Sequence, residues 1–318
     1  MTKAEIMQKK LFNKFLMVPL ALGVVGCEAP LNLEGVEQEL KKPFHRYDQL
    51  QAAASNDQKK VVVGASGTVL SSADSGQTWQ RTELEGRPSL IDIASCPDGS
   101  FIALSIDRKL WVSDAQAIQW QAKNIETMEE VLAVDCNENG YWVTGSFSTV
   151  LSSSDGGDSW GENSLGEDAQ LTTIQFLDSN NGFATGEFGI VLKTTDAGAT
   201  WEMMEYLPNE FYPQSSYFSD LNTGWVVGLS GAVVHTNDGG QSWQPQESGT
   251  EAPLYGVDGD GEVIIAVGEN GTLLNYQQGQ WQPVKDQPQV RAYLRAVDVR
   301  QGTVVSAGGS GAIVTFAQ

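Results

Sequence analysis

One short motif recurs along this chain at a nearly constant spacing. It reads Ser/Thr-x-Asp-x-Gly-x-Ser/Thr-Trp, and clear copies occupy residues 72–79, 153–160, 194–201 and 236–243. Two eroded copies end at Trp120 and Trp281, so a tryptophan follows about every 40 residues. A repeat of about 40–45 residues made of short strands is typical of a β-propeller, in which each repeat forms one blade.

The motif has the composition of a tight turn. Asp accepts hydrogen bonds from backbone amides further along a turn, Gly adopts positive φ at little cost, and Trp buries a large apolar face. We therefore predict a structural role, and no catalytic one, for the aspartates and tryptophans of the four clear copies: Asp74, Trp79, Asp155, Trp160, Asp196, Trp201, Asp238 and Trp243.

A second motif runs in phase with the first. It is an apolar strand, a Gly-x-x-Gly hairpin and another apolar strand, as in residues 61–70, 183–192 and 225–234. An apolar run before it and the Trp strand after it complete four strands per unit. Seven units follow one another, and the last ends at Gln318 after its third strand. We predict an all-β, seven-bladed β-propeller of four-stranded blades over residues 45–318, closed by an N-terminal strand near residues 36–44.

The first 26 residues have the pattern of a signal peptide. A Lys-rich start precedes an apolar stretch over residues 15–25, which is too short to span a bilayer as a helix. Gly26 and Cys27 follow, and this junction resembles a bacterial lipobox, in which cleavage precedes the Cys and its thiol is acylated. We predict lipidation at Cys27, with residues 27–44 forming a lipid-anchored tether and the closing strand. An ordinary secretory signal with an incidental Cys is the alternative.

A lipidated Cys27 would place the protein on the periplasmic side of a bacterial membrane. By resemblance to Gram-negative sorting signals, Glu28 after the Cys favours the outer membrane. Cys96 and Cys136 follow the inner strands of neighbouring blades, but they are one residue out of register when counted from the turn motifs. On a pleated strand, that offset points side chains to opposite faces. We therefore expect two buried free thiols, and their spacing does not fit a metal site.

The chain is strongly acidic, with a formal net charge of −21. Between residues 110 and 284 the only bases are Lys123 and Lys193, against 25 acidic residues. Such a field repels nucleic acid and anionic membrane surfaces, so it excludes a nucleic-acid-binding function. It favours solubility, a basic partner or a cation. The arginines lie in the units at the two chain ends, which are neighbours in a closed propeller. The sequence therefore allows a local basic patch where these units meet.

One connection between units differs from the other, mostly polar ones. Residues 202–218 are dense in methionine and aromatic side chains, which are enriched at binding surfaces. We predict a partner-binding surface there, helped by two arginines of the last unit; it comprises Met203, Met204, Tyr206, Phe211, Tyr212, Arg291 and Arg295. Local packing is the alternative for the residues of this connection.

Three acids, Asp135, Asp258 and Asp298, occupy the same place on their inner strands. They could lie together near the central channel and bind a cation. The alternative, which is the more common role of such acids, is that they form hydrogen bonds with the neighbouring backbone. We predict no metal site and no cofactor.

The turn motif is identified as the Asp-box, or bacterial neuraminidase repeat. The full unit is most similar to the photosystem II stability/assembly factor family, and residues 222–243, NTGWVVGLSGAVVHTNDGGQSW, match its recurring phrase almost position for position. That resemblance implies a seven-bladed propeller that binds a newly made membrane protein and is not an enzyme. We separately expect a monomer. Family members in photosynthetic organisms carry an arginine cluster, whereas this acidic chain has only seven arginines.

Relatives in non-photosynthetic bacteria point instead to another envelope client, such as an exporter. The sequence therefore predicts a non-catalytic, protein-binding assembly or accessory factor for a membrane complex on the periplasmic side. The alternative is a glycoside hydrolase of the sialidase type on the same Asp-box propeller. Sialidases resemble one another in an Arg-Ile-Pro motif and a clamp of three arginines; the motif is missing here, and no Arg lies between residues 109 and 290.

Overall fold

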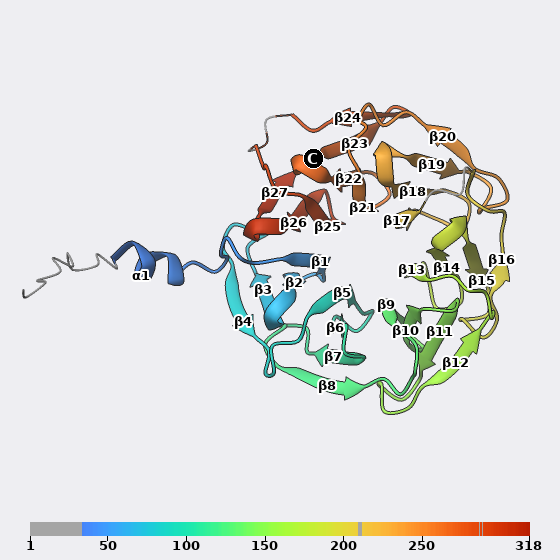
Figure 1. Cartoon of the computed structure of the whole chain (residues 1–318), viewed down its shortest axis with the longest axis horizontal. Coiled ribbons are helices and arrows are strands. Elements are labelled where there is room, and N and C mark those ends of the chain that lie inside the picture. Colours follow the sequence, from blue (N-terminus) through green and yellow to red (C-terminus); the bar gives the residue numbers. More distant parts are fainter. Residues whose placement is uncertain (1–33, 209–211, 286, 288) are drawn as a thin grey trace, which may run out of the picture. The chain divides into compact units, whose positions relative to one another are not determined.

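The computed structural model describes residues 34–208, 212–285, 287 and 289–318. They form two units, the short helix α1 (Glu34–Leu40) and a ring of seven antiparallel sheets within residues 41–318. The seven sheets surround a central channel like the blades of a propeller (Figure 1). The predicted all-β, seven-bladed propeller is therefore confirmed.

Six blades have four strands each, and the seventh has three. The strands of blades one to three are β1 (Leu50–Ser55), β2 (Lys60–Gly64), β3 (Thr68–Ser72), β4 (Gln80–Glu83), β5 (Leu90–Ser95), β6 (Phe101–Ser105), β7 (Lys109–Ser113), β8 (Trp120–Asn124), β9 (Val131–Asn137), β10 (Gly140–Gly145), β11 (Thr149–Ser153) and β12 (Gly161–Ser164). Those of blades four to seven are β13 (Leu171–Phe176), β14 (Gly182–Gly186), β15 (Val191–Thr194), β16 (Glu202–Met203), β17 (Pro213–Phe218), β18 (Gly224–Gly228), β19 (Val233–Thr236), β20 (Gln244–Gln246), β21 (Leu254–Gly259), β22 (Ile264–Gly268), β23 (Leu273–Gln277), β24 (Gln280–Pro283), β25 (Leu294–Arg300), β26 (Thr303–Gly308) and β27 (Ile313–Ala317).

The order of the strands gives the ring two distinct faces. Within each blade the strands pair consecutively from the channel outward, and the start of each inner strand pairs with the end of the second strand, as Leu50 does with Gly64. The Gly-x-x-Gly hairpins and the connections between blades therefore share one face, which we call the hairpin face. The Asp-box turns lie on the opposite face, which we call the Asp-box face. Five hairpins form short 3-10 turns: η1 (Ala65–Gly67), η2 (Glu187–Gly189), η4 (Leu229–Gly231), η5 (Glu269–Gly271) and η6 (Gly309–Gly311).

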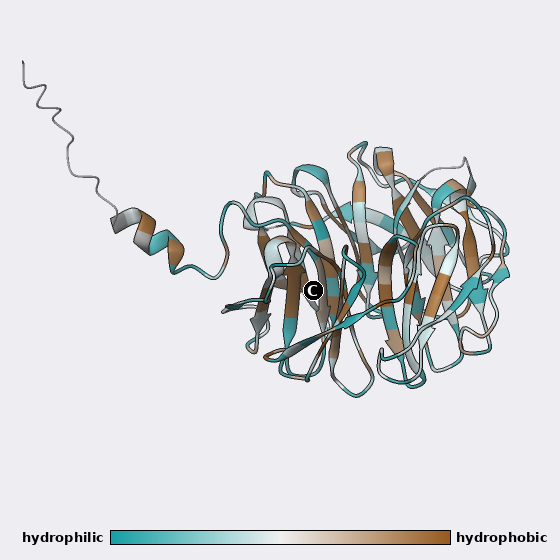
Figure 2. Ribbon diagram, turned by 60° about the horizontal axis from the view of Figure 1, so that its bottom comes forward, coloured by the Kyte–Doolittle hydropathy of each residue, from teal (hydrophilic) through white to brown (hydrophobic). Residues whose placement is uncertain are grey.

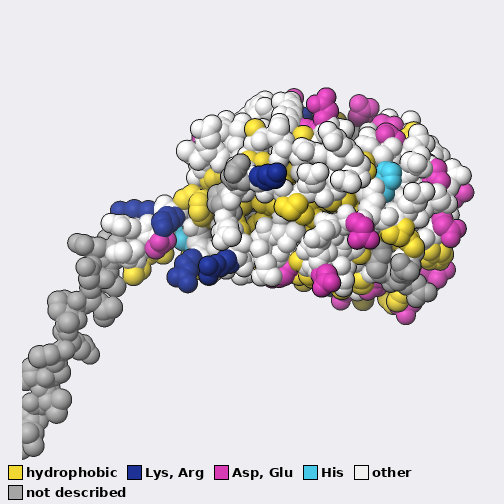
Figure 3. Space-filling model, turned by 90° about the horizontal axis from the view of Figure 1, so that it is seen from above, with side chains coloured by type: hydrophobic (Ala, Val, Ile, Leu, Met, Phe, Trp, Pro, Cys, Tyr) yellow, Lys and Arg dark blue, Asp and Glu magenta, His cyan; other side chains and the backbone are white. Residues whose placement is uncertain are grey.

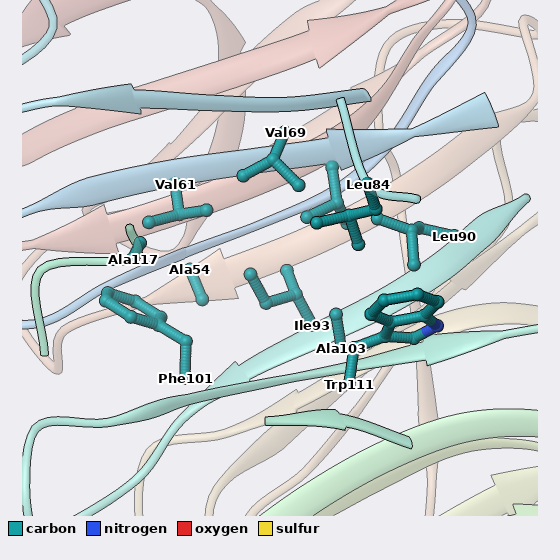
Figure 4. Packing of buried hydrophobic residues seen from close by; sticks show 11 residues of the cluster. Ala54, Val61, Val69, Leu84, Leu90, Ile93, Phe101, Ala103, Trp111 and Ala117 are labelled. Carbon is teal, nitrogen blue, oxygen red and sulfur yellow. The ribbon is translucent and has the colours of Figure 1, made fainter. Parts of the chain in front are cut away.

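The core lies between the blades, because each sheet packs one face against the next sheet. Between blades one and two, Val61 and Val69 point towards Phe101 and Trp111 across a fully apolar contact (Figure 4). Figure 2 shows the strands as largely apolar and the loops at the two rims as more polar. This arrangement explains why the second strand of the blades reads as a nearly continuous apolar run, since it is buried on both faces.

The Asp-box turns hold their shape through the predicted residues. In the first copy, Asp74 accepts hydrogen bonds from the Thr78 amide (2.8 Å), the Thr78 hydroxyl and the Ser72 hydroxyl. These donors, the Thr78 side chain first, lower the pKa of Asp74 to about 2. Asp155, Asp196 and Asp238 have equivalent partners. The carboxylates are thus occupied by their own turns.

The glycines of the second motif meet two different requirements. In blade four, Gly186 has an extended backbone, but a Cβ there would collide with the carbonyl oxygen of Gln170 on the neighbouring strand. Gly189 has φ +77°, a conformation that side-chain-bearing residues rarely adopt. One glycine therefore allows close approach of two strands, and the other closes the turn.

The predicted closing strand is wrong. Residues 34–40 form helix α1, and the seventh sheet contains only β25, β26 and β27 among the described residues. Blade seven is joined to blade one by other contacts. The Gly311 amide donates to the Asp48 carbonyl (3.0 Å), and Asp298 on β25 binds the Ser55 hydroxyl and pairs with Lys60 (3.6 Å). The segment before β1 thus takes the place of an inter-blade connection, which needs no strand pairing.

The expectation of two free thiols is also wrong, because Cys96 and Cys136 form a disulfide with a Cα–Cα distance of 5.4 Å. Cys136 pairs with Tyr141 within β9 and β10, whereas the Cys96 amide donates to Ser100 just beyond β5. The one-residue offset between the two cysteines is present in the structure. It was expected to keep the thiols apart, but it brings them together. Neighbouring blades meet through opposite faces of equivalent strands, so the offset turns the two thiols towards each other.

Cys27 and the predicted signal peptide lie outside the described residues. Within the described part of the chain, no helix has the length and apolar character needed to cross a membrane.

Candidate protein-binding face

Each of the seven inner strands contains a bulge at its start, on the hairpin face. The pairing register shifts by one residue there in every blade. The bulged residues all line the central cavity, which measures about 470 Å³, and they are Gln51, Ile91, Leu132, Thr172, Gln214, Tyr255 and Arg295. Bulges of this kind redirect side chains and are common beside functional sites. Here they turn one side chain per blade towards the mouth of the channel.

Arg295 is the only basic residue of this ring. It is exposed, and no carboxylate among the described residues lies within ion-pair distance of it. Burial raises the pKa of the Tyr212 and Tyr255 phenols and of Asp92, and the charge of this arginine opposes that rise by lowering the pKa of each of them. An exposed guanidinium with free donors is suited to bind carbonyl or carboxylate oxygens of a ligand.

Three tyrosines, Tyr212, Tyr255 and Tyr293, lie at or just before the starts of inner strands on the hairpin face. Tyr255 and Tyr293 pack edge to face with ring centroids 6.2 Å apart, and their hydroxyls donate to Glu269 (3.0 Å) and Gln49 (2.6 Å). Tyr212 bonds to Glu187; burial, followed by that carboxylate, raises the pKa of the Tyr212 phenol. Burial also raises the pKa of the Tyr255 phenol, so Tyr212 and Tyr255 can present flat apolar rings together with a neutral polar tip. Tyr and Arg are the residues that most often dominate protein interfaces.

The residues predicted for partner binding separate into different environments. Met203 is partly buried against the core between blades three and four, and Met204 against the core between blades four and five, so local packing accounts for them. Tyr206 and Tyr212 are exposed, as are Arg291 and Arg295, while Phe211 lies outside the described residues. The structure brings Tyr212 and Arg295 to one mouth. The sequence reasoning missed Tyr255 and Tyr293, although their place at the start of an inner strand was a usable signal.

The acids of the inner strands join neighbouring blades. Asp135 accepts a hydrogen bond from the Phe176 amide (2.5 Å) in the next blade, and Asp258 accepts one from the Val299 amide (2.7 Å). Burial raises the pKa of both carboxyls, for Asp135 to about 7. The backbone-bonding interpretation therefore holds for these two acids, while Asp298 binds side chains at the ring closure. Asp92, which the sequence did not single out, makes the same kind of bond to Val134.

In the part of the chain that the structure describes, no group of three or more His, Cys, Asp or Glu residues is placed to hold a metal ion. Three arginines of the chain ends are engaged in ion pairs. Arg81 pairs with Asp48 (2.8 Å), Arg87 with Glu83 (3.1 Å) and Arg300 with Asp57 (2.6 Å). Figure 3 shows acidic side chains spread over the propeller, with few basic ones between them.

Comparison with known families identifies part of the ring directly. The family model described as "Photosynthesis system II assembly factor YCF48" matches residues 112–213, from β7 to the start of β17. This part of the chain resembles the photosystem II assembly factor family. The resemblance predicted from the Asp-box and Gly-x-x-Gly motifs is thus confirmed. No curated protein sequence matches the chain significantly.

Solved structures share the fold of this assembly factor-like propeller at low sequence identity. YCF48 bound to D1 peptide is 13% identical with a TM-score of 0.70, covering 87% of this chain and 93% of that one. YCF48 from Cyanidioschyzon merolae is 16% identical with a TM-score of 0.59, covering 71% and 81%. Virginiamycin B lyase from Staphylococcus aureus is 12% identical with a TM-score of 0.74, covering 85% and 95%. At these identities the likeness concerns the fold, which serves both binding proteins and enzymes.

Proposed function

We propose that this protein is a non-catalytic, protein-binding propeller that acts as an assembly or accessory factor for a membrane complex on the periplasmic side of a bacterial envelope. The observation that carries the proposal is Arg295, exposed and without an ion pair among the described residues, beside Tyr212 and Tyr255 at the channel mouth. A segment of a client protein would dock there, with the arginine on its carbonyl or carboxylate oxygens and the tyrosines against its side chains.

The family match supports a protein client. One structural relative is titled YCF48 bound to D1 peptide, so a propeller of this fold takes a peptide ligand. In a photosynthetic host the client of the present chain would be a photosystem protein; in another host it would be a different envelope complex, such as an exporter. Because this chain is acidic and has few arginines, we expect its client to differ from that relative's ligand in charge.

The residues available at the channel favour binding over catalysis. The two histidines of the sequence, His45 and His235, are not among the residues that line the central cavity. The inner-strand acids are engaged in bonds between blades, and the Asp-box acids are engaged in their own turns. The lyase relative shares the fold alone at 12% identity, so it does not favour an enzymatic role for this chain.

The proposed compartment rests on two independent features. The junction at Gly26 and Cys27 predicts a lipid anchor, with Glu28 favouring the outer membrane. The disulfide between Cys96 and Cys136 fits an oxidising compartment such as the periplasm. The polar segment after Cys27 would tether the propeller to the membrane.

The proposal is tested by site-specific photo-cross-linking in native membranes. A photoreactive residue at Gln214, in the bulge ring, should capture a defined protein, whereas the same residue at Ile118, exposed on the Asp-box face, should not. Arg295→Ala should reduce capture from Gln214 while leaving the melting temperature unchanged, because Arg295 is exposed. Equal capture from both positions, or capture that is insensitive to Arg295→Ala, would contradict a client site at the mouth.

A further inference from the structure

Two hairpin tips on the hairpin face carry a phenylalanine where a small polar residue would serve. Phe147 and Phe188 occupy the third position of the hairpins at residues 145–148 of blade three, where Ser148 replaces the second glycine, and 186–189 of blade four; the two residues are 50% and 58% exposed. Both have left-handed backbones, with φ of 52° and 57°. In the other regular hairpins the same position holds small polar residues: Ser66, Ser230, Asn270 and Ser310.

The fold does not explain these phenylalanines. A bulky residue in the left-handed region is unfavourable, whereas Asn and Ser are tolerated there, as the other blades demonstrate. An exposed ring also contributes little burial in return. Strained, exposed positions of this kind are found where a surface has a binding function. Phe147 and Phe188 are therefore better explained by a ligand than by stability.

These side chains belong to a longer apolar arc on the same face. Met128, on the connection before blade three, is 90% exposed, and Leu229 is exposed on the hairpin of blade five. Met128 and Phe147 line one hollow of about 330 Å³, which continues to Glu187 beside Phe188. The apolar arc, defined as Met128, Phe147, Phe188 and Leu229, thus runs over the hairpins from blade three to blade five. It leads to the channel mouth through Glu187, which also bonds Tyr212.

The charge that lines the hollow of the arc is acidic. Glu129, Glu130, Asp168 and Glu187 line the same hollow as Met128 and Phe147, and no Lys or Arg is among its lining residues. Lys123 and Lys193, the only bases between residues 110 and 284, pair with Asp158 and with the Leu221 carbonyl on the Asp-box side. Arg108 is the nearest base along the chain on the hairpin face, and it donates to the Met128 carbonyl. Arg108 thus lies at the Met128 end of the arc, whereas the acidic hollow itself favours a partner that brings positive charge together with apolar side chains.

We propose that the apolar arc binds a segment of a protein partner in which Lys or Arg alternates with large apolar residues. Apolar side chains of that segment pack on Phe147, Phe188 and Met128, and its cations pair with Glu130 and Asp168. An anionic membrane surface is disfavoured, because the acidic rim repels it. This inference rests on the proposed client-binding function and adds to it a second contact surface, separate from Arg295, with the opposite charge preference.

The direct test uses purified full-length protein and three short fluorescent peptides. One alternates Lys with Phe, one replaces Lys by Glu, and one replaces Phe by Ser. We expect the Lys/Phe peptide to bind most tightly. Phe147→Asn with Phe188→Asn should weaken it about tenfold or more without lowering the melting temperature, because Asn tolerates the left-handed backbone. Ile118→Asn, at an equally exposed apolar site on the Asp-box face, is the matched control and should bind like the wild type.

A second variant tests the charge separately. Glu130→Gln with Asp168→Asn changes two exposed carboxylates, so folding is preserved, and it should weaken binding of the Lys/Phe peptide and its dependence on salt. Unchanged peptide binding in both double variants would overturn the inference, and so would preferential binding of neutral phosphatidylcholine vesicles over the peptide.

The cross-linking experiment separates this inference from the proposed function. If photo-cross-linking from Gln214 captures a client that the Phe147→Asn, Phe188→Asn variant still holds fully, the client-binding function stands and the arc is wrong. If the wild type captures no client and binds no peptide, both fail.

Discussion

Cys96 and Cys136 join blade two to blade three through a disulfide, and each approaches the other from the facing side of its own blade. The bond closes a loop with a sequence separation of 40 residues and lies in the buried core between those two blades. A cross-link of this span restricts the unfolded chain, and it also fixes how two neighbouring sheets pack.

Removing the disulfide should therefore destabilise the propeller. We expect Cys96→Ala with Cys136→Ala to lower the free energy of unfolding by about 2–4 kcal/mol. Thermal unfolding of the wild type with and without dithiothreitol provides the internal control: reductant should lower the melting temperature of the wild type and leave that of the double variant unchanged. A wild type that melts at the same temperature under both conditions would mean that the bond is absent in solution.

The contact between Asp48 and Arg81 should be important for ring closure. Asp48 is buried, accepts two hydrogen bonds from the Arg81 guanidinium (2.8 and 3.1 Å), and presents its carbonyl to Gly311 of blade seven. Asp48→Ala removes the buried partner of the Arg81 guanidinium and leaves it only the more exposed Glu83, which should cost about 3–5 kcal/mol. Glu83→Ala, which removes the more exposed partner of Arg81 and Arg87, should change stability by less than about 1 kcal/mol. Chemical denaturation of the two variants compares them directly.

Trp201, the last residue of its Asp-box, should contribute strongly to stability. Its side chain is buried against Trp142 and Phe176 in the core between blades three and four. Trp201→Ala should cost about 3–5 kcal/mol, whereas Glu202→Ala, at the exposed neighbour, should be close to neutral. The measurement is the midpoint of thermal or urea unfolding. If the Trp201 variant melts with the wild type, the burial of this tryptophan is not significant and the structural interpretation of the motif fails with it.

The repeat made most of the fold predictable from the sequence. Because the Asp-box and Gly-x-x-Gly motifs recur in phase, they fix the number of blades and the turn at each end of the strands. The closing strand could not be predicted in the same way, since residues 34–40 belong to no repeat. The pairing of Cys96 with Cys136 was missed because faces were compared within a single sheet, whereas two blades meet through opposite faces.

The candidate site was only partly predictable. Tyr212 and Arg295 were found from composition, but Met203 and Met204 share the same chemistry and are used for packing. Sequence spacing does not separate the residues that pack from those that are exposed, because the side chains buried in this connection depend on where strand β16 begins and ends. Phe147 and Phe188 were visible as large residues in a hairpin position that other blades fill with Ser or Asn. Their exposure and their left-handed backbone, on which the proposed binding role rests, are visible only in the structure.

Lipidation remains a prediction from the sequence, since Cys27 lies outside the described residues. Cys27→Ser should release the protein into the soluble periplasmic fraction and abolish labelling by a fatty-acid probe, because a lipobox Cys is the acceptor of the acyl chains that hold the protein on the membrane. The fractions and the label are read from the same cells. Cys96→Ala with Cys136→Ala, which leaves Cys27 intact, is the control and should stay labelled. Membrane retention without label in the wild type would indicate a different anchor.

The buried acids between the blades predict an unusual dependence of stability on pH. Burial raises the pKa of Asp135 from 3.8 to about 7 and that of Asp92 to about 6. Between pH 4 and 7 the folded protein therefore holds protons that the unfolded chain has released. The free energy of unfolding must then fall as pH rises through this window, by at most about 1.4 kcal/mol per pH unit for each such group. Below pH 4 the Asp-box carboxyls with lowered pKa, such as Asp74, have the opposite effect on the free energy of unfolding. Stability is lost as the falling pH protonates them.

Asp135→Asn separates this contribution from the others. The amide carries no charge at any pH, and its oxygen can still accept a hydrogen bond from a backbone amide such as that of Phe176. We expect the variant to gain less stability than the wild type when the pH is lowered from 7 to 5, as measured by urea unfolding at each pH. Asp168→Asn, at an exposed carboxylate on the hairpin face, is the control and should follow the wild type. If Asp135→Asn and the wild type show the same slope, then Asp135 is ionised in the folded protein at neutral pH, and the backbone donors outweigh its burial.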